Sequence, residues 1–272
     1  MKPLVYITGA GGYLGSSIIK KFLYERDYNL LISFDDINET INDGIKADVV
    51  IHLAAKLPSF KGDPNIILET NLEATKKIVE TRCKEGAHFI FLSTDYVFKS
   101  DENVVHYEND IREPETVYGE SKALAEDYLL NQNKLDVTIL RTSMLYGYNH
   151  PKRTNFFKFL HDKVSNNEEV ELFTDVYSRP THVQDVNYFI DKVIKERLTG
   201  VIHACGADYV NRYDLGKLFC ESNGFNSDLL VKTQMPKDGR WPSALNLGPS
   251  TIFIDSLTTT LKEGVAKCLK EF

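Results

Sequence analysis

Short apolar runs alternate with longer segments of helical periodicity through the first half of the chain. We predict strands where an apolar run stands between turn-forming residues, at 4–7, 29–34, 48–53, 89–92 and 137–141. We predict helices where apolar residues recur every three or four positions, at 16–24, 39–45, 66–83 and from 121 onward. This alternation predicts an α/β fold, with a mostly parallel sheet joined by right-handed crossovers.

The pattern is less regular after residue 150. We predict helices at 156–164, 185–196 and 213–223, and strands at 168–173 and 201–204. Asp185 is a suitable N-cap for the second of these helices. The segment 232–250 has no periodicity, and a closing helix is predicted over 256–272.

These elements predict a Rossmann-type doubly wound parallel sheet with a small C-terminal lobe. Residues 1–150 form the expected sheet domain, and residues 175–205 return to it. Residues 151–174 and 206–255 form the expected lobe, which would cap the C-terminal edge of the sheet and bind substrate.

Composition and charge narrow the class of protein. The 272 residues carry a formal net charge of −7, which argues against a nucleic acid or an anionic membrane as the main partner. Apolar runs are too short to cross a membrane and the N-terminus lacks a signal-peptide pattern, so we expect a cytoplasmic protein. The four cysteines show neither Cys-x-x-Cys spacing nor clustered histidines, so we expect reduced, mostly buried thiols and no metal site.

A glycine-rich segment follows the first predicted strand and leads into the first predicted helix. Its glycines are Gly9, Gly12 and Gly15, and Tyr13 and Leu14 stand between the last two. Glycines permit a tight turn and a close approach of the backbone to a pyrophosphate, which then lies at the helix N-terminus. We therefore predict that this loop binds NAD(P)H, with a plain glycine turn as the alternative.

An acidic residue after the second predicted strand bears on the choice between NADH and NADPH. Asp35 stands about 20 residues past the glycine loop, where an acid binds the adenosine ribose 2′-hydroxyl and repels a 2′-phosphate. Asp36 and Ile37 could equally contact the adenine, and a plain turn is the third interpretation. The short link to the next strand leaves room for one helix and no extra strand, so the choice of cofactor stays open.

Small residues close the third predicted strand. Leu53, Ala54 and Ala55 stand where backbone would approach a ligand, so we place them in the cofactor site. His52, just before them, is expected to be a packed strand-end histidine rather than a catalyst. Asn71, in the following helix, is also assigned to this site, where it either fixes neighbouring backbone or faces solvent.

Tyr118 and Lys122 are the leading candidates for chemistry. They are four positions apart on a predicted helix, so the phenol and the ammonium share one face. A nearby cation favours the phenolate and lowers the pKa of the tyrosine, which would make Tyr118 a proton donor near neutral pH. Ser93, Thr94 and Asp95 end a central strand upstream, where doubly wound sheets bind ligands.

Taken in order, these motifs resemble an extended short-chain dehydrogenase/reductase, and within that superfamily the dTDP-4-dehydrorhamnose reductase branch. The motifs that carry the resemblance are residues 8–15, 52–55, 93–98, 117–122 and 140–147, followed by Arg179-Pro180-Thr181 before Asp185. The resemblance extends over nearly the whole chain and is strongest from 1 to 150.

The resemblance implies a reductase that acts on a nucleotide-linked 4-keto-6-deoxy sugar. Tyr118 would protonate the developing alkoxide as the nicotinamide delivers hydride, and Lys122 would hold the nicotinamide ribose. Thr94 would donate a hydrogen bond to the carbonyl oxygen of the sugar. Substrate contacts are expected from Asp95, Tyr96, Met144, Arg179 and Arg240.

Related activities differ at identifiable positions. Tyr96 stands where sugar-nucleotide dehydratases of this superfamily carry a catalytic Glu, which argues against dehydration. Met144 stands where the reductase branch usually has a Trp against the sugar, so the particular substrate is left open. A sugar-nucleotide epimerase and a non-catalytic dinucleotide-binding regulatory subunit remain as alternatives, and a homodimer is compatible with the sequence.

Overall fold

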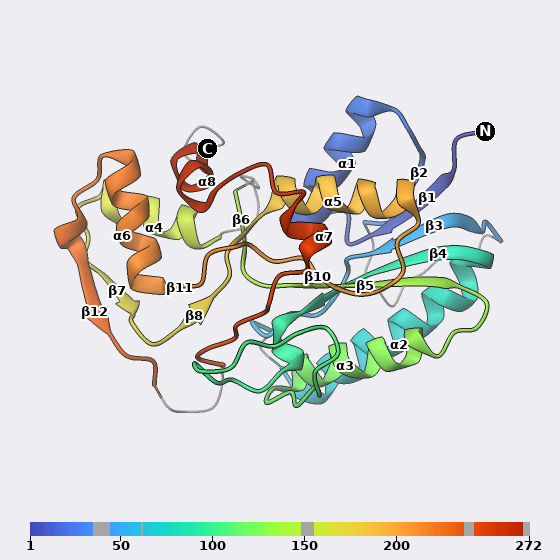
Figure 1. Ribbon diagram of the computed structural model, residues 1–272, viewed down its shortest axis with the longest axis horizontal. Helices are drawn as coiled ribbons and strands as arrows, with labels where there is room; N and C mark the ends of the chain where they lie inside the picture. Colours follow the sequence, from blue (N-terminus) through green and yellow to red (C-terminus); the bar gives the residue numbers. More distant parts are fainter. Residues whose placement is uncertain (35–43, 61, 148–154, 237–241, 269–272) are drawn as a thin grey trace.

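Six parallel strands form the central sheet in the computed structural model (Figure 1), which describes residues 1–34, 44–60, 62–147, 155–236 and 242–268. The strands are β1 (Leu4–Thr8), β2 (Asn29–Ile32), β3 (Ala47–His52), β4 (Cys83–Thr94), β5 (Asp136–Thr142) and β10 (Gly200–His203). They lie in the order β10-β5-β4-β3-β1-β2, and every neighbouring pair is parallel. The predicted fold class is therefore confirmed.

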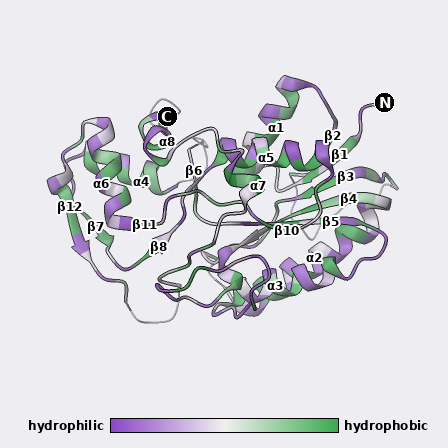
Figure 2. Cartoon of the chain, in the orientation of Figure 1, coloured by the Kyte–Doolittle hydropathy of each residue, from purple (hydrophilic) through white to green (hydrophobic). Residues whose placement is uncertain are grey.

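Helices cover both faces of this sheet. On one face α1 (Tyr13–Glu25) packs against α5 (Val183–Glu196), and on the other α2 (Pro64–Arg82) packs against α3 (Val117–Leu130) (Figure 1). Successive side chains of β1 point to opposite faces of the sheet. Val5 and Ile7 pack in the apolar core on the side of α1 and α5, and Tyr6 packs in the core on the side of α2 and α3. Figure 2 shows that the strands are mostly apolar, as expected for a sheet buried on both faces.

The direction of the strand order changes at β1. The chain runs outward from β1 to β2 and then returns to β3 on the other side of β1. In doubly wound sheets, ligands bind outside the carboxyl ends of the strands at such a reversal. Among the described residues β2 is the edge of the sheet. Most of the link between β2 and β3, including most of the helix predicted at 39–45, lies outside the described residues.

A smaller lobe has an apolar core of its own. It is built from α4 (Phe156–Ser165), β7 (Val170–Phe173), α6 (Arg212–Asn223), β12 (Leu230–Thr233) and α8 (Leu261–Lys267). In this core the rings of Phe157 and Phe219 stack with centroids 5.2 Å apart, and β12 pairs with β7. Two short pairs, β6 (Leu145–Tyr146) with β9 (Thr181–His182) and β8 (Tyr177–Ser178) with β11 (Val210–Asn211), lie between the lobe and the sheet.

Two predictions about the C-terminal half are wrong, and one carboxylate explains both. The N-cap of α5 is His182, whose Nδ1 accepts a hydrogen bond from the backbone N–H of Gln184 at 3.3 Å. Asp185 is buried in the first turn and accepts hydrogen bonds from the backbone N–H and the hydroxyl of Thr258. These bonds hold the chain in a loop at Thr258, and within the described part of the expected closing helix over 256–272 the helix is α8 (Leu261–Lys267), which follows the separate short helix α7 (Thr251–Ile254).

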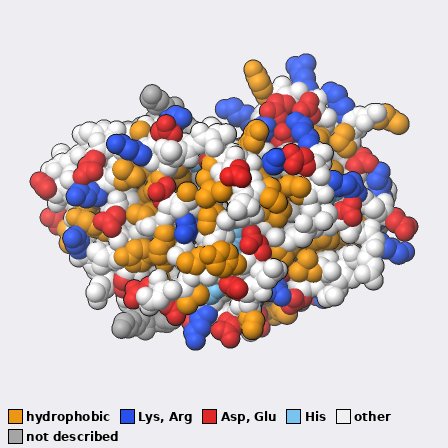
Figure 3. Space-filling model, in the orientation of Figure 1, with side chains coloured by type: hydrophobic (Ala, Val, Ile, Leu, Met, Phe, Trp, Pro, Cys, Tyr) orange, Lys and Arg blue, Asp and Glu red, His pale blue; other side chains and the backbone are white. Residues whose placement is uncertain are grey.

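Charged side chains of both signs are intermixed on the face seen in Figure 3, notably where α1 and α5 lie. Glu25, Asp27 and Asp191 converge there, and Lys21 and Lys195 contact these carboxylates. The cluster is therefore an ion-pair network. Within the described ranges, every helix is too short or too polar to cross a membrane.

Candidate active site

The glycine loop connects β1 to α1 and lies against the end of β3. Gly9 has a φ of +67°, and a Cβ added there would lie 2.7 Å from the backbone nitrogen of Ala54. A Cβ on Gly15 would lie 2.1 Å from the carbonyl oxygen of Gly9. Both positions require glycine, because any side chain would push the helix, the loop and the end of β3 apart.

The N-terminus of α1 is suited to an anionic group. Gly12 is its N-cap and provides no side-chain hydrogen bond, so the first N–H groups of the helix are left for a ligand. The side chain of Leu14, in the first turn of α1, is buried. The hydroxyl of Tyr13 accepts a hydrogen bond from the side chain of Asn155 at 3.0 Å. These features fit the pyrophosphate of a dinucleotide. Asp35, Asp36 and Ile37 lie outside the described residues.

His52 holds the backbone that faces the glycine loop. Its Nδ1 lies 2.7 Å from the hydroxyl of Thr8, and that hydroxyl accepts the backbone N–H groups of Leu53 and Ala54 at 3.2 Å. Burial lowers the pKa of His52 to about 3, so the ring is neutral at physiological pH. The interpretation of His52 as a packed histidine is confirmed.

Asn71 connects α2 to the half-buried backbone after β3. Its Oδ1 accepts the backbone N–H of Lys56 at 2.7 Å, directly after Ala55, and its Nδ2 donates to Ser121 Oγ at 2.9 Å. The hydroxyl of Ser121 donates to the carbonyl oxygen of Tyr118 at 2.7 Å. Asn71 is buried, so of its two predicted roles the fixing of backbone is confirmed.

Tyr118 and Lys122 lie near the N-terminus of α3, which begins four residues earlier than predicted. Thr116 caps the helix by accepting the backbone N–H of Gly119 at 3.0 Å. A Cβ on Gly119 would lie 2.1 Å from the carbonyl oxygen of Tyr96, so α3 packs closely on the short helix η2 (Asp95–Val97). The rings of Tyr96 and Tyr118 consequently meet edge to face, with centroids 5.8 Å apart.

The electrostatics of this pair differ from the prediction. Burial raises the pKa of Tyr118, and the Asp95 carboxylate raises it further. Burial lowers the pKa of Lys122 to about 7, against the opposing effect of Glu126. The Lys122 nitrogen lies 3.8 Å from the centroid of the Phe91 ring. The expected lowering of the Tyr118 pKa by Lys122 is therefore wrong for this state, because an ammonium this deeply desolvated loses its own proton first.

Thr94 ends β4 in a hydrogen-bonded group with two neighbours. Its hydroxyl donates to Asp95 Oδ1 at 2.9 Å, and the hydroxyl of Ser143 donates to Asp95 Oδ2 at 2.7 Å. Asp95 is buried, and burial raises the pKa of its carboxyl. Both oxygens of Asp95 are thus occupied by hydroxyl groups, and Thr94 is fixed at the carboxyl end of the sheet.

A cavity of about 430 Å³ opens beside this group. Residues from both parts of the molecule line it, namely Asp95, Tyr96, Ser143, Met144, Phe173, Val176, Tyr177, Ser178, Arg212, Met235, Pro242 and Leu245. Three of the expected substrate contacts, Asp95, Tyr96 and Met144, are among them. Arg179 is not, because its guanidinium donates to Asn246 Oδ1 at 2.8 Å and to the carbonyl oxygen of Ala207. Arg240 lies outside the described residues.

Sequence reasoning missed Arg212. Its Nη1 lies 2.7 Å from both Met144 Sδ and Ser178 Oγ, which brings the cation into the wall of the cavity. An arginine directly before a predicted helix gives no signal of this role, because such residues usually face solvent. Ser143 was missed for a similar reason, although it directly precedes Met144 in a recognised motif.

A buried ion pair supports the helix that carries Tyr118 and Lys122. Glu126, one turn beyond Lys122, is fully buried and accepts a hydrogen bond from Arg141 Nη2 at 2.7 Å. Arg112 Nη1 donates to the same carboxylate at 3.1 Å, and the Ser93 hydroxyl donates at 2.5 Å. The network joins α3 to the ends of β4 and β5.

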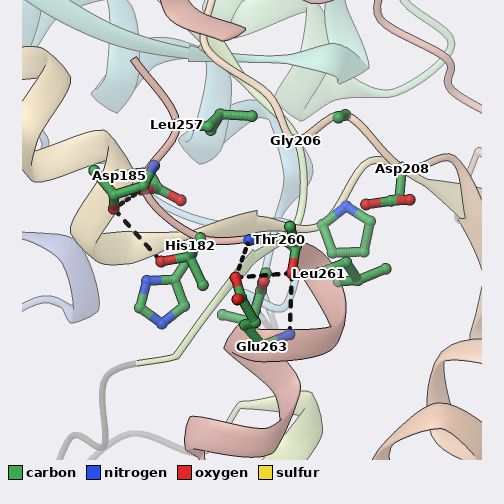
Figure 4. A pocket seen from close by; sticks show the side chains of 13 residues that line it. His182, Asp185, Gly206, Asp208, Leu257, Thr260, Leu261 and Glu263 are labelled. Carbon is green, nitrogen blue, oxygen red and sulfur yellow. Dashed lines mark hydrogen bonds between the residues drawn. The ribbon is translucent and has the colours of Figure 1, made fainter. Parts of the chain in front are cut away.

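A second cavity, of about 230 Å³, lies between the N-terminus of α5, the loop after β10 and the C-terminal segment (Figure 4). Two of its carboxylates are hydrogen-bonded within the chain. Glu263 Oε2 accepts the hydroxyl of Thr260 at 2.9 Å, and Asp185 accepts from Thr258. The bonds from Thr258 to Asp185 anchor the C-terminal segment to α5.

The site combines three features: a glycine loop at the strand-order reversal, a tyrosine and a lysine one turn apart on α3, and a hydroxyl at the end of β4. Together they define a dinucleotide-binding protein of the extended short-chain dehydrogenase/reductase class. The chain belongs to the family described as RmlD substrate binding domain, whose model matches residues 1–271. The resemblance stated from the sequence motifs is thereby confirmed.

Characterised relatives cover most of the chain. It is 28% identical to dTDP-4-dehydrorhamnose reductase of Aggregatibacter actinomycetemcomitans, over 76% of this chain and 75% of that protein. It is 26% identical to methionine adenosyltransferase 2 subunit beta of Mus musculus, over 94% of this chain and 86% of that protein. The chain is therefore similar both to a protein named as a sugar-nucleotide reductase and to one named as a subunit of a different enzyme.

Solved structures share the fold over the full length. A dTDP-4-dehydrorhamnose reductase from Bacillus anthracis in complex with NADP superposes with a TM-score of 0.85 at 23% identity, covering 99% of both chains. MoeE5 in complex with UDP-glucuronic acid and NAD superposes with a TM-score of 0.80 at 21% identity, covering 98% of both chains. Proteins of this fold thus bind either dinucleotide.

Proposed function

We propose that the protein is an NAD(P)H-dependent reductase of a nucleotide-linked keto sugar, of the 4-keto-6-deoxy class that the resemblance implies, with Tyr118 as proton donor. The observation that carries the proposal is the packing of α3, which carries Tyr118 and Lys122, against the end of β4, where Thr94 lies. Thr94 ends a central strand, and Gly119 brings α3 against the residues that follow Thr94. Asp95 and Tyr96, the two residues after Thr94, line the cavity of about 430 Å³, whose volume is within the usual size of small-molecule sites.

The glycine loop, Leu53 to Ala55 and Lys122 would hold the cofactor, which supplies the hydride. Thr94 donates a hydrogen bond to the sugar carbonyl oxygen, where negative charge develops. The Tyr118 hydroxyl then gives its proton to this oxygen, which becomes the product hydroxyl. The raised pKa of Tyr118 keeps that proton in place at physiological pH. Protonated Lys122 stabilises the resulting phenolate until solvent returns a proton to it.

Two alternatives make different demands on the cofactor. A sugar-nucleotide epimerase would return the hydride to its substrate and keep the cofactor unchanged. A regulatory subunit would bind the dinucleotide without turnover, and the similarity to methionine adenosyltransferase 2 subunit beta favours this second candidate. Retention of Thr94, Tyr118 and Lys122 together favours the reductase, because mere binding of the dinucleotide does not require a proton donor.

The test begins with fluorescence titration of the protein with NADH and NADPH separately. A panel of dTDP-, UDP- and GDP-linked keto sugars is then added to the loaded protein, and oxidation of the cofactor is followed by absorbance. Stoichiometric oxidation by one sugar supports the reductase. Tight cofactor binding without oxidation by any member of the panel contradicts it and favours the alternatives.

Tyr118→Phe removes only the proton that the proposal requires. We expect turnover to fall by about 10²–10⁴-fold while the dissociation constant of the cofactor changes little. Tyr128→Phe, ten residues further along the same helix and packed on the core beneath it, is the matched control and should retain activity. Near-normal turnover by the Tyr118 variant would remove this residue from the mechanism.

A further inference from the structure

One side of the cavity of about 430 Å³ is formed by an irregular segment, residues 242–248, which we call the strap. Pro242 and Leu245 of the strap line the cavity, and the segment leads toward α7 (Figure 1). Residues 244–248 are buried, although their only regular pairing consists of isolated β-bridges at Ala244 and Leu247. Buried backbone outside helices and sheets needs other partners for its N–H and C=O groups. The residues that supply those partners therefore set the position of the strap.

One edge of the strap is bound by the loop that follows η2. The hydroxyl of Ser100 accepts hydrogen bonds from the backbone N–H groups of Ser243 and Ala244, at 3.1 and 2.8 Å. The same hydroxyl donates to the carbonyl oxygen of Ala244 at 3.3 Å, and the backbone N–H of Asp101 donates to that oxygen at 3.0 Å. A single side chain thus satisfies two consecutive N–H groups of the strap.

The other edge of the strap is bound by β8 and the residue after it. The backbone N–H of Tyr177 donates to the carbonyl oxygen of Ser243 at 2.7 Å. The guanidinium of Arg179 donates to Asn246 Oδ1 at 2.8 Å. The strap is therefore hydrogen-bonded both to the loop after η2 and to β8. Because η2 and β8 both carry residues that line the cavity, the strap connects two parts of its wall.

Leu245 connects the strap to the residues that follow Thr94. It packs in a small apolar cluster with Val97 and Phe98, and Tyr96 packs against the same cluster. Leu245 directly follows Ala244, so a movement of the backbone that Ser100 holds also moves Leu245. Ser100 is not among the described residues that line the cavity, so its effect on a bound ligand passes through the strap.

We propose that Ser100 is a positioning residue for the sugar nucleotide, because it holds the strap and thereby keeps Pro242 and Leu245 in the cavity wall. This inference rests on the proposed function, since it assumes that the cavity binds a nucleotide-linked sugar. The expected cofactor site is formed by the glycine loop and the end of β3, and the hydrogen bonds of the strap described above go to other parts of the chain. Ser100 therefore affects the affinity for the sugar nucleotide and not the affinity for the cofactor.

The inference is tested by equilibrium binding to Ser100→Ala, which leaves two N–H groups of the strap without their acceptor. The probes are dTDP-glucose, UDP-glucose and GDP-mannose, titrated by calorimetry into protein loaded with NADH or NADPH. These sugars carry no ketone, so they do not consume the cofactor. We expect the dissociation constant of the sugar nucleotide to rise about 10-fold in the variant, and that of the cofactor to stay unchanged.

Ser100→Thr keeps the hydroxyl and should retain the affinity of the wild type for the sugar nucleotide. Ser256→Ala is the matched control, because it removes a serine hydroxyl that donates to the carbonyl oxygen of Ile252 at 2.9 Å, outside the strap. It should leave both affinities unchanged. Cofactor titration verifies that each variant is folded. If the alanine variant is not, Ser100→Cys provides the test, because its sulfur is a weaker acceptor at the same place and should give a smaller loss.

Three results would overturn the inference. Unchanged affinity of Ser100→Ala for a sugar nucleotide that the wild type binds would reject it and leave the proposed reductase intact. An equal loss of affinity for sugar nucleotide and cofactor would show that Ser100 supports the fold as a whole and not the substrate cavity. Failure of the wild type to bind any of the three sugar nucleotides would reject the proposed function, and the inference with it.

Discussion

The side-chain amide of Asn71 donates a hydrogen bond to Ser121 Oγ at 2.9 Å, across the boundary between α2 and α3. The same Ser121 hydroxyl donates to the carbonyl oxygen of Tyr118, so a residue of α2 sets the position of the first turn of α3. Asn71 also holds the Lys56 backbone beside the expected cofactor site. One amide thus aligns the two sides of the site.

Asn71→Ala should therefore reduce kcat more than it affects cofactor binding. It leaves the Lys56 N–H without its acceptor and frees Ser121, so we also expect the free energy of unfolding to fall by about 1–3 kcal/mol. Steady-state kinetics and denaturant unfolding measure the two effects. Glu69→Ala, an exposed change on the same helix, is the control. A variant with reduced stability but unchanged kcat would show that Asn71 is structural only.

Two glycines of the loop should respond differently to the same substitution. Gly15→Ala places a methyl group 2.1 Å from the Gly9 carbonyl oxygen, so helix and strand must separate. We expect a loss of about 1–3 kcal/mol in stability and weaker NADPH or NADH binding. Gly11→Ala meets only the Phe34 side chain at 3.8 Å and should cost less than about 0.5 kcal/mol. Thermal unfolding and cofactor titration of both variants decide the matter, and equal effects would contradict the close packing at Gly15.

The pKa of Lys122 makes a prediction about pH. Because burial lowers this pKa to about 7, the ammonium loses its proton as the pH rises through that value. The ammonium is the form that stabilises a phenolate on Tyr118, so kcat/KM should fall above about pH 7. Lys122→Arg keeps its charge at higher pH and should lose this descending limb. The same descending limb in the Arg variant would assign the titration to another group.

Stability provides an independent check of the same pKa. Between about 7 and the ordinary value of 10.5, folded Lys122 is neutral while unfolded Lys122 holds its proton. The unfolded state then binds more protons, so the contribution of Lys122 to the free energy of unfolding rises with pH across this window. The difference between wild type and Lys122→Met, measured by denaturant unfolding at several pH values, should therefore become more favourable to wild type. A pH-independent difference would argue against the lowered pKa.

The buried carboxylate of Glu126 should be among the most sensitive positions for stability. Glu126→Gln removes the charge that Arg141 and Arg112 share and leaves the buried Arg141 without a full partner. Breaking a buried pair in this way typically costs about 3–5 kcal/mol. Glu120→Gln on the exposed side of α3 is the control. Equal midpoints of urea unfolding for the two variants would contradict a structural role of the network.

The sheet was predictable because its signals are local. Parallel strands buried on both faces are short apolar runs, and Val5, Tyr6 and Ile7 need no long-range information to be recognised. The glycine loop, the Tyr118–Lys122 spacing and the hydroxyl at Thr94 are likewise patterns within one segment. Their arrangement around the strand ends then follows from the topology of the doubly wound sheet.

Features that depend on partners distant in the sequence were missed. Arg212 reaches the cavity through contacts with Met144 and Ser178, and Asp185 binds Thr258 in the loop between α7 and α8. The sign of the Tyr118 pKa shift was also missed, because the i, i+4 spacing gives the charge of Lys122 but not its burial. Desolvation is a property of the assembled core, so it cannot be derived from the spacing of two residues.

The two walls of the large cavity fold around separate apolar cores. Thr94 and Tyr118 belong to elements of the central sheet, whereas Arg212 opens a helix whose buried face packs in the lobe with Phe157 and Phe219. Under the proposed function, substitutions in the lobe can accumulate while the residues proposed for hydride transfer are preserved. The proposal therefore implies that sugar preference can diverge under constant chemistry, and that a chimaera exchanging only the lobe takes its selectivity from one parent and its redox step from the other.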